Sequence, residues 1–150
     1  MKRQAGMTMV ELIVAVAVTG VIVTFLGTAI YQITTVSEYG NNRLTALHEL
    51  QNAAHWFNQD SQGAREATGG SQLLILTLSD NSTVSYSLVG TELRRASGGP
   101  QMTLARNITL ANFSINNRIV TMSLTSSPAG RDDVSQNGTY MVSLRPAEGG

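Results

Sequence analysis

The stretch that decides the fold lies near the N-terminus and reads Gly6-Met7-Thr8-Met9-Val10-Glu11, followed by Leu12 to Ile30. The second part holds 19 residues without a charge and is rich in Val, Ile, Leu and Ala. A helix of that length measures roughly 28 Å, which is close to the hydrocarbon thickness of a bilayer. Lys2 and Arg3 precede it and no basic residue follows before Arg43, so the positive-inside rule places the N-terminus in the cytoplasm. The stretch therefore predicts one membrane-spanning helix with the rest of the chain exported.

Length and composition exclude several classes of protein. A chain of 150 residues has room for about one domain. Ten basic and ten acidic residues cancel, so no net positive charge points to nucleic acid. The sequence has no cysteine, which excludes a disulfide scaffold and a thiolate metal site.

Two general explanations of the apolar stretch, a signal peptide and a signal anchor, leave Glu11 unexplained. A secretory signal peptide would have a shorter apolar region and a small-residue cleavage site, for which Gly27-Thr28-Ala29 is the available candidate. A plain signal anchor explains the length of the stretch. Neither needs a carboxylate at its edge, where a charge costs about 2.5–3.5 kcal/mol if it reaches the bilayer centre. Glu11 is therefore a candidate functional residue.

The run from Gly6 to Glu11, with the basic leader before it and the apolar stretch after it, resembles the type III signal of bacterial type IV pilins and pseudopilins. The resemblance implies that prepilin peptidase cleaves after Gly6 and methylates the new N-terminus, Met7. It also implies that Glu11 pairs with the Met7 amine of a neighbouring subunit, which removes two unpaired charges together. The family most often has Phe at the new terminus and a proline later in the helix, where this sequence has Met7 and Thr28.

Small residues follow one face of the predicted membrane helix. Gly20, Thr24 and Thr28 are spaced by four residues, and Gly27 lies beside them. Small residues at this spacing let helices approach closely in an apolar medium. The pattern predicts packing against other helices.

The helical pattern continues beyond the membrane. An apolar stripe formed by Leu47, Leu50, Ala54 and Phe57, flanked by Ala53 and Ala64, predicts an amphipathic helix. A break or bend is expected at Gly40-Asn41-Asn42, and Gly69-Gly70 ends the helix, so that it runs from about Met7 to Thr68. The stretch from Glu49 to Asp60 loosely resembles minor pilins and J-like minor pseudopilins.

Strands are expected after Gly70. Alternating or continuous apolar runs predict them at 73–78, 83–89, 91–95, 108–115, 119–125 and 140–144. A turn at Asp80-Asn81 is expected between the first two, and Asn116-Asn117 is expected to join 108–115 and 119–125 as a hairpin. The predicted fold class is α+β, a long N-terminal helix packed on a C-terminal antiparallel β-sheet. The expected domains are a leader (1–6), a transmembrane and filament-core helix (7–36), its amphipathic extension (37–68) and an exported sheet domain (69–150).

No catalytic or cofactor site is expected. His48 and His55 are seven residues apart, about 10.5 Å along a helix, which is too far to share one metal ion. Asp132, Asp133 and Asn137 offer oxygen ligands for calcium, but the spacing does not follow the EF-hand and an ordinary turn is preferred.

A basic surface for DNA or another polyanion would need four arginines to lie together. These are Arg94, Arg95, Arg106 and Arg118. A solvated face is the preferred interpretation, so a nucleic-acid partner is not expected.

The expected function is that of a structural subunit, minor rather than major, of a type IV pilus or type II secretion filament. Its expected partners are prepilin peptidase, other pilin-like subunits, the inner-membrane assembly platform and the lipid bilayer. Its expected location is the inner membrane and then a periplasmic or cell-surface filament. The alternative is a signal-anchored exported binding module that never polymerises, which predicts no cut after Gly6 and no effect of replacing Glu11.

Overall fold

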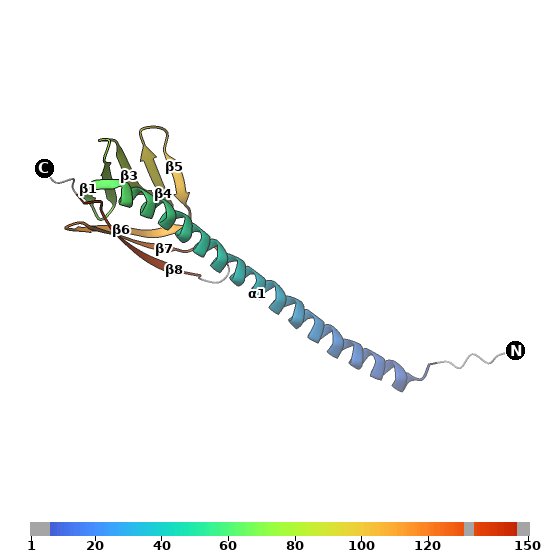
Figure 1. The fold of residues 1–150 in the computed structure, drawn as a ribbon. Helices are drawn as coiled ribbons and strands as arrows, with labels where there is room; N and C mark the ends of the chain where they lie inside the picture. The colour runs from blue at the N-terminus through green and yellow to red at the C-terminus, as the bar shows by residue number, and fades with distance from the viewer. Residues whose placement is uncertain (1–6, 131–133, 147–150) are drawn as a thin grey trace. The chain divides into compact units, whose positions relative to one another are not determined.

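The computed structural model describes residues 7–130 and 134–146, and these form one helix and eight strands (Figure 1). The chain divides into two compact units, Met1–Glu38 and Tyr39–Gly150. The first unit contributes only helix to the described structure, whereas the second contains all of the strands. The predicted α+β fold, with a long N-terminal helix packed on antiparallel sheet, is confirmed.

Helix α1 comprises Met9–Gly63. It is helical through Gly40-Asn41-Asn42, so the expected interruption of the helix is not found there. The helix also ends earlier than expected, because the residues after Gly63 pair with a strand. Strand β1 (Ala64–Gly70) forms a hairpin with β2 (Leu73–Leu78), in which Ala67 lies opposite Leu76. Pairing within this hairpin overrides the helical propensity of the Ala- and Glu-containing sequence.

The first sheet has five antiparallel strands in the order β1-β2-β3-β4-β5. Its remaining members are β3 (Thr83–Val89), β4 (Glu92–Ser97) and β5 (Met102–Ala105). The predicted turn at Asp80-Asn81 joins β2 to β3: Asn81 has φ 68°, and Asp80 Oδ1 accepts the Ser82 backbone N–H at 2.9 Å. Asparagine and aspartate favour such turns because they tolerate the left-handed region and bond to their own backbone.

The second sheet has three antiparallel strands in the order β6-β7-β8. They are β6 (Ile108–Asn116), β7 (Ile119–Ser126) and β8 (Gln136–Ser143). The sequence predicted a single sheet, omitted β1 and β5 as strands, and started the last strand at Tyr140. The sheets separate at Asn107, whose φ of 56° turns the chain between β5 and β6. The hydropathy pattern does not reveal that the chain passes from one sheet to the other at this residue.

The core lies where one face of α1 meets the inner faces of both sheets within Tyr39–Gly150. Phe57 is fully buried and its ring meets that of Tyr86 on β3 edge to face, with 6.2 Å between centroids. The buried face of the helix runs through Ala46, Leu50, Ala53 and Phe57. The predicted stripe therefore lies on the correct side of the helix but is not centred on the buried face. Leu47 and Ala54, which it includes, are only half-buried at the margin of that face.

Candidate processing and assembly site

The first turn of α1 begins with a reciprocal pair of polar residues, Thr8 and Glu11. Thr8 donates its backbone N–H and its hydroxyl to Glu11 Oε2, at 3.0 Å and 3.1 Å. The Glu11 backbone N–H in turn donates to Thr8 Oγ1 at 3.3 Å. This is a capping box, in which the residue before the helix and the third helical residue satisfy each other's free N–H groups. The Thr-x-x-Glu pattern before the apolar run was visible in the sequence but was not used there.

The capping box keeps one oxygen of Glu11 available. Both hydrogen bonds from Thr8 reach Oε2, and no group among residues 7–130 and 134–146 donates to Oε1. The carboxylate also lies in the first helical turn, where the helix dipole favours negative charge. A subunit on its own thus orients this carboxylate without neutralising it.

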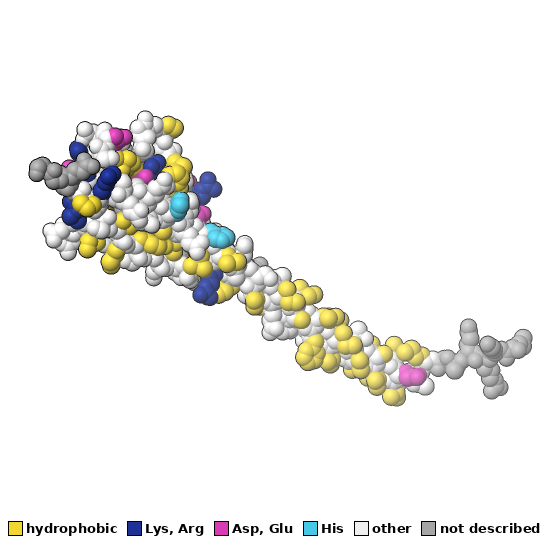
Figure 2. All heavy atoms as spheres, in the orientation of Figure 1, with side chains coloured by type: hydrophobic (Ala, Val, Ile, Leu, Met, Phe, Trp, Pro, Cys, Tyr) yellow, Lys and Arg dark blue, Asp and Glu magenta, His cyan; other side chains and the backbone are white. Residues whose placement is uncertain are grey.

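The rest of the N-terminal unit presents a bare apolar surface. An 18-residue window of α1 has a mean hydropathy of 2.5 and none of it is buried. Hydrophobic side chains cover this part of the helix in Figure 2. Met7, the expected new N-terminus, is 68% exposed. Gly6, after which cleavage is expected, lies outside the described residues.

The small residues of the expected packing face are open, and the hydroxyls among them are satisfied. Thr24 Oγ1 donates to the Gly20 carbonyl at 2.8 Å, and Thr28 Oγ1 donates to the Thr24 carbonyl at 3.0 Å. A side chain added at Gly20 or Gly27 would meet nothing within 4 Å. The helix can therefore enter lipid without leaving these hydroxyls unpaired, and its role in packing stays a prediction.

The side chains considered as metal ligands are not brought together in the described part of the chain. His48 and His55 are both exposed on α1, and among residues 7–130 and 134–146 no three His, Cys, Asp or Glu side chains could hold a metal ion together. Asn137 lies on β8. Asp132 and Asp133 lie outside the described residues, so the calcium hypothesis is not tested.

The four arginines considered as a basic patch are engaged individually. Arg94 pairs with Glu92 at 2.9 Å, which holds the pKa of that carboxyl below its ordinary value. Arg106 lies 3.8 Å from the same carboxylate, and Arg118 donates to the Leu144 carbonyl. Arg95 pairs with Asp60 on α1 at 2.7 Å. Three of the four arginines thus lie beside two carboxylates, Glu92 and Asp60, which offset part of their charge and weaken the case for a polyanion surface.

A polar cluster that the sequence did not reveal joins α1 to the first sheet. Arg95 Nε and Nη2 donate to the two oxygens of Asp60 at 2.7 Å and 2.8 Å. The Tyr86 hydroxyl donates to the same carboxylate, and the Arg95 guanidinium lies 4.8 Å from the centre of the Trp56 ring. Burial, followed by the hydrogen bond to Asp60, raises the pKa of Tyr86. The cluster thus links α1 to β3 and β4 of the first sheet through side-chain hydrogen bonds.

Comparison with known protein families finds a match in the N-terminal region. Residues 1–27 match the prokaryotic N-terminal methylation motif. No curated protein and no solved structure matches the chain. The matched region contains Gly6, Met7, the capping box and most of the bare apolar helix. The motif therefore supports the assignment of this chain to the type IV pilin and pseudopilin family, as a pilin-like substrate of prepilin peptidase.

Proposed function

We propose that this chain is a structural subunit of a type IV pilus or type II secretion filament, and a minor subunit within it. The observation that carries the proposal is the methylation motif on a helix whose apolar surface is not covered by any residue that the structure describes. Such a surface is stable only in lipid or against other helices. Other pilin-like subunits and the inner-membrane assembly platform are the expected partners. The strand-rich unit would lie outside the inner membrane.

Glu11 would guide assembly through its open oxygen. Cleavage after Gly6 creates a positive amine at Met7, close to Glu11 in sequence. In a filament, the amine of one subunit would approach Glu11 Oε1 of its neighbour, while Thr8 holds Oε2. The pair would remove two charges that are costly when single in an apolar medium. Assembly would then favour the register in which amine and carboxylate meet.

The first experiment measures the intact mass of the chain from a host that co-expresses prepilin peptidase. Loss of Met1 to Gly6 together with the gain of one methyl group is the expected result. A Gly6→Leu variant should keep its leader, because a bulky residue at the cut would not fit a site that accepts glycine. A full-length wild-type chain would favour the signal-anchored binding module, and a cut near Ala29 would indicate a secreted soluble protein.

A second experiment tests assembly separately from processing. Glu11→Leu should be inserted, cleaved and methylated, yet be recovered from sheared filaments at a small fraction of the wild-type level. Glu66→Leu, which removes an exposed carboxylate from β1, is the matched control and should be recovered normally. Normal incorporation of the Glu11 variant would contradict the charge-pairing role.

A further inference from the structure

Strand β8 leaves one long edge of the second sheet uncovered. It pairs with β7 along its whole length, from Ser126 opposite Gln136 to Ile119 opposite Ser143, without a shift in register. No described residue pairs with its other side. The strand contains no charged residue and no proline. Proteins commonly protect exposed edges with charges, prolines, bulges or short strands, because a bare edge is a template for another strand.

The other three edges in the described structure all carry such protection. Strand β1 has an irregular register near Glu66 and carries Arg65. Strand β5 has only four residues and follows a register shift in β4. Strand β6 is irregular at its start and is tied to the first sheet, where Phe113 N–H donates to the Ser71 carbonyl at 3.0 Å. The bare edge of β8 is therefore not a general property of this fold.

The backbone groups that face outward on β8 can be assigned from its register. The Leu144 N–H donates to the Arg118 carbonyl at 2.7 Å, which makes these two residues a hydrogen-bonded pair. Hydrogen-bonded and non-hydrogen-bonded pairs alternate along an antiparallel ladder. The even-numbered residues of β8 therefore bond to β7. The odd-numbered residues direct their N–H and C=O groups away from the sheet, and these are Asn137, Thr139, Met141 and Ser143.

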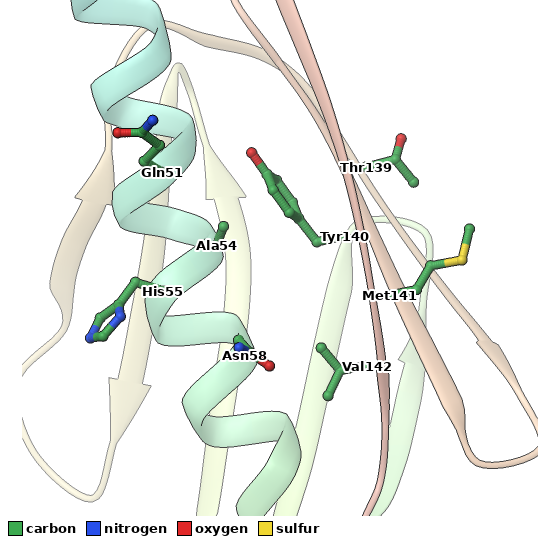
Figure 3. Close-up of a pocket in the computed structure, with 8 residues that line it drawn as sticks. All are labelled: Gln51, Ala54, His55, Asn58, Thr139, Tyr140, Met141 and Val142. Atoms are coloured by element: carbon green, nitrogen blue, oxygen red, sulfur yellow. The ribbon is translucent and has the colours of Figure 1, made fainter.

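A groove of about 470 Å³ runs beside this edge, between β8 and α1. In Figure 3 the Tyr140 ring points toward the helix, whereas Met141 points away from it. The Tyr140 ring lies over Gly138, where a Cβ atom would come within 2.5 Å of its hydroxyl oxygen. The helix side is lined by Ala54, His55 and neighbouring amide side chains. Among the residues that the structure describes, no Lys, Arg, Asp or Glu lines the groove, so a charged occupant would find no counter-ion there.

We propose that β8 and this groove bind an extended, uncharged segment of a partner polypeptide, which adds as a fourth strand to the second sheet. Its backbone would pair with the outward N–H and C=O groups of the edge, and alternate apolar side chains would enter the groove beside Tyr140. A second copy of this chain is the alternative occupant, and the dependence of amide protection on protein concentration distinguishes it from a partner.

The test uses the full chain in detergent micelles and a capped peptide of alternating valine and threonine as the probe. Amide exchange at Thr139 and Met141 should slow by about five- to tenfold at saturating peptide, as expected when an N–H group enters an ordinary hydrogen bond. A second peptide with the same side chains, but with every backbone amide nitrogen methylated so that neither of its edges can donate a hydrogen bond, should give no protection. Protection by both peptides would overturn the proposal, since it would show apolar adhesion without strand pairing.

Variants separate the edge from general surface hydrophobicity. Met141→Pro removes one outward N–H and spares the bonds to β7, so it should weaken peptide binding by roughly fivefold or more. Met141→Lys places a charge on the edge and should also weaken binding. Leu110→Lys is the matched control, because it replaces an exposed apolar residue on β6 and should bind the peptide normally.

Two further outcomes would overturn the proposal. Unchanged exchange at saturating peptide would show that the edge does not accept a strand. Protection without peptide that grows with protein concentration would show that a second copy occupies the edge. The binding needs neither cleavage after Gly6 nor polymerisation, so its failure would leave the filament role untouched.

Discussion

Replacing Arg95 by methionine should lower the free energy of unfolding of the strand-rich unit by about 3 kcal/mol. Methionine keeps an apolar side chain near Trp56 but removes the guanidinium. Asp60, only 7% exposed, would lose both of the N–H groups that Arg95 donates and would keep only the Tyr86 hydroxyl. A buried carboxylate left in this state is strongly destabilising.

The magnitude follows from the exposure of the two partners. Removing one member of a buried ion pair costs roughly 3–5 kcal/mol. The Arg95 side chain keeps 16% of its surface exposed, so water can reach the vacated position and the lower end of the range applies. A double variant, Asp60→Leu with Arg95→Met, leaves no buried charge. It should therefore cost less than Arg95→Met alone, about 1 kcal/mol for the Tyr86 hydroxyl that loses its acceptor.

The assay is urea denaturation of the full chain in detergent micelles. Trp56 is the single tryptophan of the sequence, so its fluorescence reports on this unit, and far-UV circular dichroism should give the same midpoint. The control is Arg94→Met. Arg94 neighbours Arg95 and pairs with Glu92, but the two side chains are 37% and 32% exposed. An exposed pair of this kind contributes at most about 1 kcal/mol.

Two results would refute the reasoning. Equal losses for the Arg95 and Arg94 variants would show that the buried pair behaves like a surface pair. A double variant less stable than Arg95→Met alone would show that the orphaned charge is not the main cost.

Three other changes test further parts of the structure. Thr8→Val removes the helix cap and should speed amide exchange in the first turn of α1 by a free-energy equivalent of about 1 kcal/mol, whereas Thr19→Val should not. Because the pKa of Tyr86 is raised above its ordinary 10.0, the unfolded state ionises first as pH rises. The contribution of Tyr86 to stability should therefore be constant below pH 10 and fall above it by at most about 1.4 kcal/mol per pH unit, and urea midpoints of Tyr86→Phe should lose this slope above pH 10. Gly138→Ala should displace the Tyr140 ring and lower the thermal midpoint, whereas Gly70→Ala, where a Cβ meets nothing within 4 Å, should not displace any side chain.

Patterns within a short stretch of sequence predicted the elements that depend only on neighbouring residues. The apolar run after Glu11 is long enough to be a membrane helix wherever it lies, and α1 contains it. The Asp80-Asn81 and Asn116-Asn117 turns depend on residues that adopt left-handed torsions, and Asn81 and Asn117 do so at φ 68° and 54°. In these cases the residue type and its neighbours in sequence are sufficient.

Elements that depend on pairing with a neighbouring strand were missed or misplaced. Ala64 to Gly70 continues a helical pattern in sequence but becomes β1 because β2 pairs with it. Strand β8 starts at Gln136, since Ser126 of β7 offers it a partner there. The hydropathy of a segment does not say whether another strand will pair with it.

The sequence by itself determined the anchor and its chemistry: the basic leader, the cut after Gly6 that the motif implies, the cap formed by Thr8 and Glu11, and the apolar helix. These depend on side chains within a few turns of one helix. Only the tertiary structure decided how the strand-rich unit is held together and what it exposes. Asp60 and Arg95 meet because α1 packs against the first sheet, and the β8 edge is bare because of the order of strands in its sheet. Both depend on contacts between distant segments, which hydropathy and spacing along one chain do not encode.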